Sequence, residues 1–465
     1  MNWTTELAAK IKGPVLLDDG AREAASTDFG RIAERKPAAV VRAASAVDVA
    51  ETVKFAGRHS LHAVPRGAGH SQSSQSLSDD ILLDLRGLDQ VIRINTEGLS
   101  VSCQAGITWR ALLKSLLPLG LSPPVLTNNL DVTVGGTLST AGIGVASWRH
   151  GTQADHCVKL EVVTGDGERV RCSSQSNADL FNAVRAGSGW FGVITEATLR
   201  LRRHKPHCRT LYLLYDDLGA LLNDLKTLMD EERFDYLEAW CAPLPQGFLK
   251  LGDERRPFAQ WFFPLHCTIE IDETGGTDDA ACPVDAEKLH DLHFYKHTHT
   301  EDGKLHDFFS RLDALFDLWK AGGFWNCAHP WMECILPWES APLYIGQVIE
   351  RIPSQILAGG HILLWPARGS ATSVPLFARP GGEKVIGFGI LPSVPKHLLP
   401  RALPMLKQAG HAGMMLGGKR YISGWLDFDA ADWKEHYGAL MSQIIDLKQK
   451  YDPQRVFNDC PDYFP

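Results

Sequence analysis

The segment RGAGHS, at residues 66–71, decides how this chain is interpreted. It follows a short apolar run and precedes a second one at residues 81–85, a pattern that predicts a strand, a glycine-broken loop and another strand. Gly67 and Gly69 lack the Cβ atoms that would keep a ligand away from the backbone. Consecutive exposed N–H groups can then form a concavity that binds a phosphate. His70 stands directly after the second glycine, so its side chain can touch whatever the loop holds.

The composition is that of a globular protein, and it argues against two classes of function. Of 465 residues, 44% are apolar and 22% are charged, and the length suggests two or three domains. A formal net charge of -8 argues against nucleic-acid binding, because a phosphate backbone needs a basic protein face. No apolar run approaches the roughly 20 residues of a membrane span, so no membrane partner is expected.

Residues 1–13 and the cysteines suggest where the protein works. Lysines stand in residues 1–13 where a signal peptide needs its apolar core, so we expect a cytoplasmic protein with reduced thiols. The ten cysteines have no repeated spacing, which predicts neither a disulfide framework nor a zinc ribbon. The histidines between positions 290 and 306 lack the cysteine or carboxylate pattern that would complete a site, so no metal is expected.

Two further glycine-rich segments follow the first. In TVGGTLSTAGIG (residues 133–144), small residues and hydroxyls alternate without a helix or strand period, as expected of a backbone that passes close to a large, flat, polar ligand. GSGWFG (residues 187–192) matches the dinucleotide pattern GxGxxG, but the Rossmann fingerprint needs a strand before it and a helix after it. Here a predicted helix precedes the segment and the β-patterned residues 193–201 follow it. No Rossmann NAD site is therefore predicted.

The second half of the chain predicts another lobe of mixed helices and strands. Its composition changes after His204 and becomes rich in tryptophan and proline. Strands are expected at 234–240, 267–271, 362–365 and 385–391, and helices at 218–228, 308–319 and 433–451. The predicted class of the whole chain is α+β.

Together these segments resemble those of the cytokinin dehydrogenases, a branch of the vanillyl-alcohol-oxidase or PCMH-type FAD-binding flavoproteins. The resemblance covers nearly the whole chain and is strongest from residue 26 to residue 201. The motifs that carry it, in the family's order, are STDFG (26–30), RGAGHS with Gln75, LTNNLDVTVGGTLSTAGIG (126–144), RHG (149–151), NADLFNAVRAGSGWFGVIT (177–195), WNCAHPW (325–331) and YDPQR (451–455).

The resemblance implies how the α+β fold is divided. A two-lobed PCMH-type FAD-binding domain is expected at residues 26–204, and an α+β substrate, or cap, domain at residues 205–415. Residues 416–465 would form a C-terminal segment that returns to the FAD-binding domain.

The resemblance also implies the cofactor, FAD, and a covalent bond to it. His70 matches the histidine that the family joins to the 8α carbon of the flavin; without the resemblance it would be a loop histidine with ordinary hydrogen bonds. The expected cofactor-binding residues are Arg66, Gly67, Ala68, Gly69, His70, Ser71, Gln75, Asn128, Thr133, Ser139, Ile143 and Ile194.

One departure from the family falls on the catalytic position. Asn128 stands where the family has its catalytic aspartate. An amide oxygen can accept a hydrogen bond from a substrate N–H, but it cannot act as a base at neutral pH. Either no base is needed at this point or another group supplies one. Besides Asn128, the candidate catalytic residues are Asp131, which is three residues further on, and Glu270, which matches an acidic residue near the family's substrate channel or is a surface carboxylate.

The function that the resemblance implies is that of an FAD-dependent oxidoreductase. It would oxidise a C–N bond of a secondary amine, such as an N6-substituted adenine, by hydride transfer to flavin N5, and oxygen or a quinone would accept the electrons. Two alternatives remain open: a flavin oxidase of an alcohol or of a biosynthetic intermediate, and a flavin-binding protein without catalysis. The sequence predicts no oligomeric state.

Overall fold

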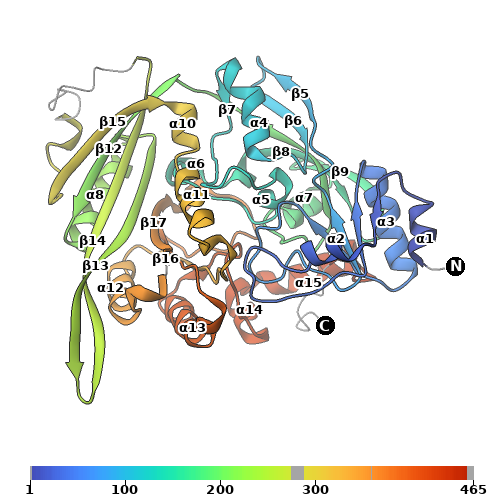
Figure 1. Cartoon of the computed structure of the whole chain (residues 1–465). Coiled ribbons are helices and arrows are strands. Elements are labelled where there is room, and N and C mark those ends of the chain that lie inside the picture. The colour runs from blue at the N-terminus through green and yellow to red at the C-terminus, as the bar shows by residue number, and fades with distance from the viewer. Residues whose placement is uncertain (1–2, 274–286, 358, 458–465) are drawn as a thin grey trace.

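This computed structural model describes residues 3–273, 287–357 and 359–457, and it shows an α+β fold built on four β-sheets (Figure 1). The first sheet contains β1 (Val15–Leu16), β2 (Ala39–Arg42), β4 (Ile81–Asp84) and β3 (Ala63–Arg66), in that spatial order. Strands β2, β4 and β3 are parallel. Helix α3 (Ala46–Arg58) crosses from β2 to β3. The RGAGHS loop therefore leaves the carboxyl end of β3, an edge strand of this sheet, as the strand–loop–strand prediction required.

The second sheet is antiparallel and has five strands. They are β5 (Val91–Asn95), β6 (Ser100–Gln104), β10 (Val193–Arg200), β8 (Cys157–Val163) and β9 (Arg169–Ser173), in that order. Helices α4 (Trp109–Leu116) and α7 (Ala178–Val184) bury their leucines in one core with these strands. Helix α7 lies directly before the GSGWFG segment and β10 directly after it. The inverted order of elements, on which the rejection of a Rossmann site rested, is confirmed.

The largest sheet has eight strands. They are β15 (Lys296–Lys304), β12 (His207–Tyr215), β14 (Glu254–Ile271), β13 (Tyr236–Leu251), β17 (His361–Arg368), β18 (Lys384–Leu391), β16 (Met332–Pro337) and β19 (Lys419–Arg420). One face packs apolar side chains against α8 (Leu218–Asp230), α12 (Ala341–Arg351) and α13 (Leu399–Met415). Because successive side chains of a strand point to opposite faces, Leu211 and Leu213 of β12 lie in that core while Thr210 and Tyr212 face the other way.

Beyond this sheet, β13 and β14 continue as a two-stranded ribbon that extends away from the body (Figure 1). Strand β14 pairs with β12 only as far as Phe263, and β13 pairs with β17 only over residues 239–241. The sequence predicted much shorter strands here. Pro243, Pro245 and Gly247 interrupt the strand pattern in the sequence, since such residues are depleted from strand interiors.

Three other local predictions need correction. Residues 134–138 of the second glycine-rich segment form a short helix, α5 (Val134–Leu138), capped by the hydroxyl of Thr133; one and a half turns are too short to show a helical period. The helix expected at 308–319 is divided into α10 (Leu305–Phe309) and α11 (Asp313–Ala321). The final helix is divided into α14 (Ala430–Tyr437) and α15 (Leu440–Tyr451). The division falls at Gly438, because its φ of 54° does not occur in the interior of an α-helix.

The C-terminal helix packs against the first 200 residues. Helix α15 contacts α7, and Lys448 donates from Nζ to the carbonyl of Trp190 at 3.0 Å and to Asp452 at 2.6 Å. The N–H of Ala63 donates to the carbonyl of Val456 at 2.8 Å. These contacts bring the segment up to residue 457 back beside β3, the strand that delivers the RGAGHS loop.

In the described ranges, no helix is long and apolar enough to span a membrane. Within the same ranges, no group of three or more histidine, cysteine, aspartate or glutamate side chains is arranged to hold a metal ion.

Candidate active site

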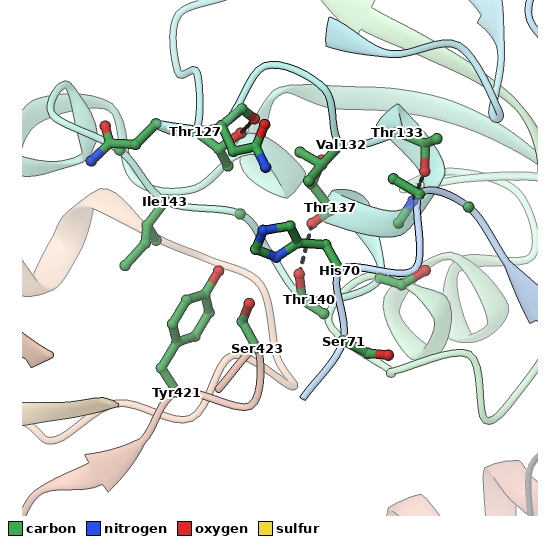
Figure 2. Close-up of a pocket in the computed structure, with 18 of the residues that line it drawn as sticks. His70, Ser71, Thr127, Val132, Thr133, Thr137, Thr140, Ile143, Tyr421 and Ser423 are labelled. Carbon is green, nitrogen blue, oxygen red and sulfur yellow. Dashed lines mark hydrogen bonds between the residues drawn. The ribbon is translucent and has the colours of Figure 1, made fainter. Parts of the chain in front are cut away.

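A cavity of about 280 Å³ lies where the three larger sheets meet. Its walls are the RGAGHS loop, the second glycine-rich segment, the inner strands β17 and β18, and a C-terminal turn. In Figure 2, His70, Ile143, Tyr421 and Ser423 point into this cavity from three segments that are far apart in the sequence.

His70 is half-buried and lines the cavity. Its imidazole stacks on the ring of Phe29, with centroids 3.9 Å apart, and Nε2 has no hydrogen-bond partner among the described residues. Burial, with a smaller contribution from the nearby His329, lowers the pKa of His70 to about 4. At neutral pH the ring is therefore uncharged.

The STDFG segment braces the histidine loop from behind. The N–H of Phe29 donates to the carbonyl of Gly69 at 2.8 Å, and the N–H of Gly30 donates to the carbonyl of Ser71 at 3.0 Å. The hydroxyl of Ser71 donates to Asp28 at 3.0 Å. The two motifs are 40 residues apart in the sequence and are joined by these hydrogen bonds in the fold.

Glycine is required where the two loops meet. A Cβ on Gly67 would stand 2.1 Å from Oγ1 of Thr133, and Gly69 has a φ of +70°. Gly67 therefore lets the two loops pack closely against each other, and residues of both loops line the cavity. Two glycine-rich segments in the cavity wall, together with the buried and unpaired ring nitrogen of His70, fit a large, flat cofactor with a phosphate tail.

The structure brings most of the predicted cofactor-binding residues together. Those that line the cavity are Gly67, Ala68, Gly69, His70, Ser71, Gln75, Asn128, Thr133, Ser139, Ile143 and Ile194. Arg66 does not line it; its guanidinium lies under the loop and donates to the carbonyls of Ala25 and Thr27.

Asn128 faces a carboxylate that the sequence did not reveal. Its Nδ2 donates to Oε1 of Glu238 at 2.9 Å, and its Oδ1 accepts from Arg311 at 2.8 Å. Arg311 also donates to Glu238 Oε1 at 3.0 Å. Glu238 lies on β13, lines the cavity, and has a side chain only 6% exposed. Burial raises the pKa of Glu238, but the charge of Arg311, the electrostatic effect of His266 and the hydrogen bonds of Asn128 and Arg311 outweigh it and hold the pKa below its usual value.

The structure places the other two candidate catalytic residues elsewhere. Asp131 is exposed at the surface and pairs with Arg110 at 2.6 Å. Glu270 is buried but accepts hydrogen bonds from Arg202 and from the hydroxyl of Tyr236. Neither carboxylate lines the cavity.

Glu333 is a second carboxyl group of the cavity that sequence reasoning missed. It lies on β16, directly after the WNCAHPW motif, and lines the cavity together with Tyr421. Burial raises the pKa of Glu333 to about 8, although the charge of Arg420 opposes the shift. At neutral pH this group is therefore a neutral acid that can donate a hydrogen bond.

This pKa makes stability depend on pH. Between pH 4.5, the ordinary value, and about 8, the folded protein holds the Glu333 proton that the unfolded chain releases. Stability therefore falls as the pH rises through that interval. We expect Glu333→Gln to raise the midpoint of thermal unfolding by several degrees more at pH 9 than at pH 5. Equal shifts at both pH values, with the exposed Glu350→Gln as background, would contradict the raised pKa.

Comparisons with known proteins agree with this geometry. The family described as "FAD binding domain" matches residues 37–173, and the family described as "Cytokinin dehydrogenase 1, FAD and cytokinin binding" matches residues 273–464. Among individual proteins, the chain is similar to cytokinin dehydrogenase 9 of Oryza sativa subsp. japonica, with 30% identity over 480 residues, which is 95% of this chain and 90% of the rice protein. It is also similar to cytokinin dehydrogenase 7 of the same rice, with 29% identity over 97% of this chain and 91% of that protein. A third relative, an uncharacterized oxidoreductase, ORF5 in the fasciation locus of Rhodococcoides fascians, is 28% identical over 94% of this chain and 96% of its own length.

Proposed function

This chain belongs to the cytokinin dehydrogenase family of FAD-dependent oxidoreductases, and on that premise we propose that it oxidises the C–N bond of a secondary amine, with Glu238 as the base. FAD, when bound, supplies the hydride acceptor at flavin N5. The observation that carries the proposal is the contact of Glu238 with Asn128 and Arg311 in the wall of the cavity.

Glu238 has what the base requires. It lines the same cavity as the histidine loop, and its lowered pKa leaves it ionised at neutral pH. Its Oε1 is held by Asn128 and Arg311, while Oε2 has no hydrogen-bond partner among the described residues. A free carboxylate oxygen can take the proton of a substrate N–H as the hydride leaves the adjacent carbon. Asn128 then serves as the group that orients the base, in place of the family's aspartate.

The character of the cavity favours a substrate with one apolar and one polar end. Apolar walls come from Phe316, Leu363 and Trp365, whereas Glu238 and Glu333 supply an acceptor and a donor. An N6-substituted adenine has an apolar substituent, a secondary amine and a heterocycle with hydrogen-bonding edges. We therefore propose this substrate class, and residues 205–415 as the part of the chain that selects it.

We also propose that FAD is bound covalently through His70. The attacking imidazole must be unprotonated, and burial keeps His70 in that form at neutral pH. Gly67 and Gly69 line the same cavity as His70, and the contact with Phe29 fixes the ring. Residues 26–204 together with 416–465 would form the FAD-binding part of the chain.

A donor screen tests the function. The oxidised protein is mixed without oxygen with isopentenyladenine, with a primary alcohol or with an aryl alcohol, and flavin absorbance is recorded. We expect isopentenyladenine to bleach the flavin. Bleaching by alcohols alone would instead support an alcohol oxidase, for which Glu238 would take the O–H proton. A flavin that no donor reduces would contradict catalysis and favour a flavin-binding protein.

A further inference from the structure

A second cavity, of about 250 Å³, adjoins the first and shares Glu238 with it. It lies on the polar face of the eight-stranded sheet, across β15, β12, β14 and β13, and α10 packs over β12 and β15 beside it. Most of its lining is polar and includes Thr210, Tyr212, Glu238, His266, Glu301 and Arg311. A cavity lined by so many polar groups is expected to hold water.

The strand register sets three of these side chains in a row. His266 of β14 stands opposite Glu238 of β13 on one side and opposite Tyr212 of β12 on the other. Nδ1 of His266 is 3.9 Å from the nearest carboxylate oxygen of Glu238, Oε2. The rings of His266 and Tyr212 lie edge to face at 4.7 Å, and the Tyr212 hydroxyl donates to Glu301 at 3.0 Å. Glu301 is exposed, so the row leads from the buried Glu238 to solvent.

Glu238 needs such a route. Substrate and cofactor together would fill the first cavity, and the side chain of Glu238 is only 6% exposed. Its Oε1 is occupied by Asn128 and Arg311, which leaves the unpaired Oε2, the atom nearest His266, to carry a proton. A base that cannot release its proton serves only one turnover.

We propose that the second cavity is the exit for the proton that Glu238 takes from the substrate, and that His266 is the first group to receive it. The inference rests on the proposed function of Glu238. The substrate N–H bond breaks and its proton forms an O–H bond on Glu238, while bound FAD would accept the hydride from the adjacent carbon. That proton then moves to the imidazole of His266, directly or through one water molecule, and from the imidazole to cavity water and solvent. The carboxylate is restored, and oxygen or a quinone would take the two electrons from bound FAD.

The surroundings of His266 suit this role. Burial lowers the pKa of His266, and the charge of Arg311 lowers it further, whereas Glu238 raises it. The net effect is a lowered pKa, so the ring is neutral and able to accept a proton. Trp240 is the other ring beside it, at 6.1 Å. Tyr212 is itself no proton carrier, because burial and the bond to Glu301 raise its pKa to about 12. Tyr212 instead fixes Glu301 at the mouth of the cavity.

The experiment separates chemistry from proton release. In His266→Ala we expect the first anaerobic reduction of the flavin, with the donor found in the screen, to keep its rate within about twofold. Steady-state turnover should fall tenfold or more, and a pH-indicator dye in weakly buffered solution should show proton release delayed to the same extent. Added imidazole should restore both, and should raise the thermal midpoint of the resting variant by occupying the space that the side chain leaves. The matched control is His297→Ala, on β15 of the same sheet, which lines neither cavity and should behave as the wild type.

Each other outcome overturns the inference. If His266→Ala leaves turnover unchanged, the cavity is only a water-filled space or takes another ligand. The same conclusion follows if imidazole binds to the variant without restoring its turnover. If Glu238→Gln leaves the first reduction unchanged, the base itself is wrong and the route falls with it. If no donor reduces the wild-type flavin, both proposals fail. If only the proton route is wrong, Glu238→Gln should still slow the first reduction of the flavin, whereas His266→Ala should have no effect.

Discussion

Replacing His70 by alanine is expected to leave no flavin attached to the denatured polypeptide. The wild-type protein, precipitated with trichloroacetic acid, should remain yellow and fluoresce on a denaturing gel. The reason is chemical: burial holds the imidazole unprotonated, with a pKa of about 4, and the ring faces the cavity at the centre of the glycine loop. The expected effect is a complete loss of the covalent adduct, with FAD released into the supernatant.

His329→Gln is the matched control for this experiment. His329 stacks on the ring of Phe29, as His70 does, and burial likewise lowers its pKa to about 4, but it does not line the cavity. This variant should keep its flavin through precipitation. A colourless wild-type precipitate under a yellow supernatant would contradict the covalent bond, although it would leave FAD binding intact.

Replacing Glu238 by glutamine is expected to slow anaerobic flavin reduction by about 10² to 10⁴, the usual contribution of a well-placed base. Glutamine keeps the size of the side chain and can still bond to Asn128 and Arg311, but it cannot take a proton. Because the contacts that orient the substrate are retained, donor affinity should change much less than the rate of reduction. The measurement is stopped-flow absorbance over a range of donor concentrations.

Asp131→Asn provides the comparison for Glu238. Asp131 is the carboxylate nearest to Asn128 in the sequence, yet it pairs with Arg110 at the surface. Its replacement should alter the rate of reduction by less than about twofold, as expected of an exposed ion pair with little energetic weight. If Asp131→Asn were the slow variant and Glu238→Gln the normal one, the assignment of the base would be reversed.

The cofactor side of the site could be predicted because its signals are local. Closely spaced glycines identify the loop at 66–71 and the segment at 133–144, and both line the cavity. The α+β class followed from strand and helix periods in the same way. The short helix α5 was missed because five residues carry too little periodicity, and the division of the last helix was missed because Gly438 gives only a weak signal in an otherwise helical pattern.

The substrate side could not be predicted, because its groups meet only in three dimensions. Asn128 and Glu238 are 110 residues apart in the sequence. Glu270 was chosen instead, and it lies on the same polar face of the sheet as His266, the residue opposite Glu238. Glu270 lies four positions after His266 on β14, a distance of about 13 Å along a strand. At that position Glu270 meets Arg202 and Tyr236 and never reaches the cavity. One signal was available: a glutamate at position 238 inside a predicted apolar strand.

The proposed reaction is tested most directly by its products in a single turnover. The oxidised protein is mixed anaerobically with one equivalent of isopentenyladenine, and the mixture is analysed by flavin absorbance and by mass spectrometry. C–N oxidation followed by hydrolysis of the imine predicts full bleaching of the flavin with one adenine and one unsaturated aldehyde released per flavin. Unchanged isopentenyladenine beside an oxidised flavin, or bleaching that yields an oxidised side chain still joined to adenine, would contradict it.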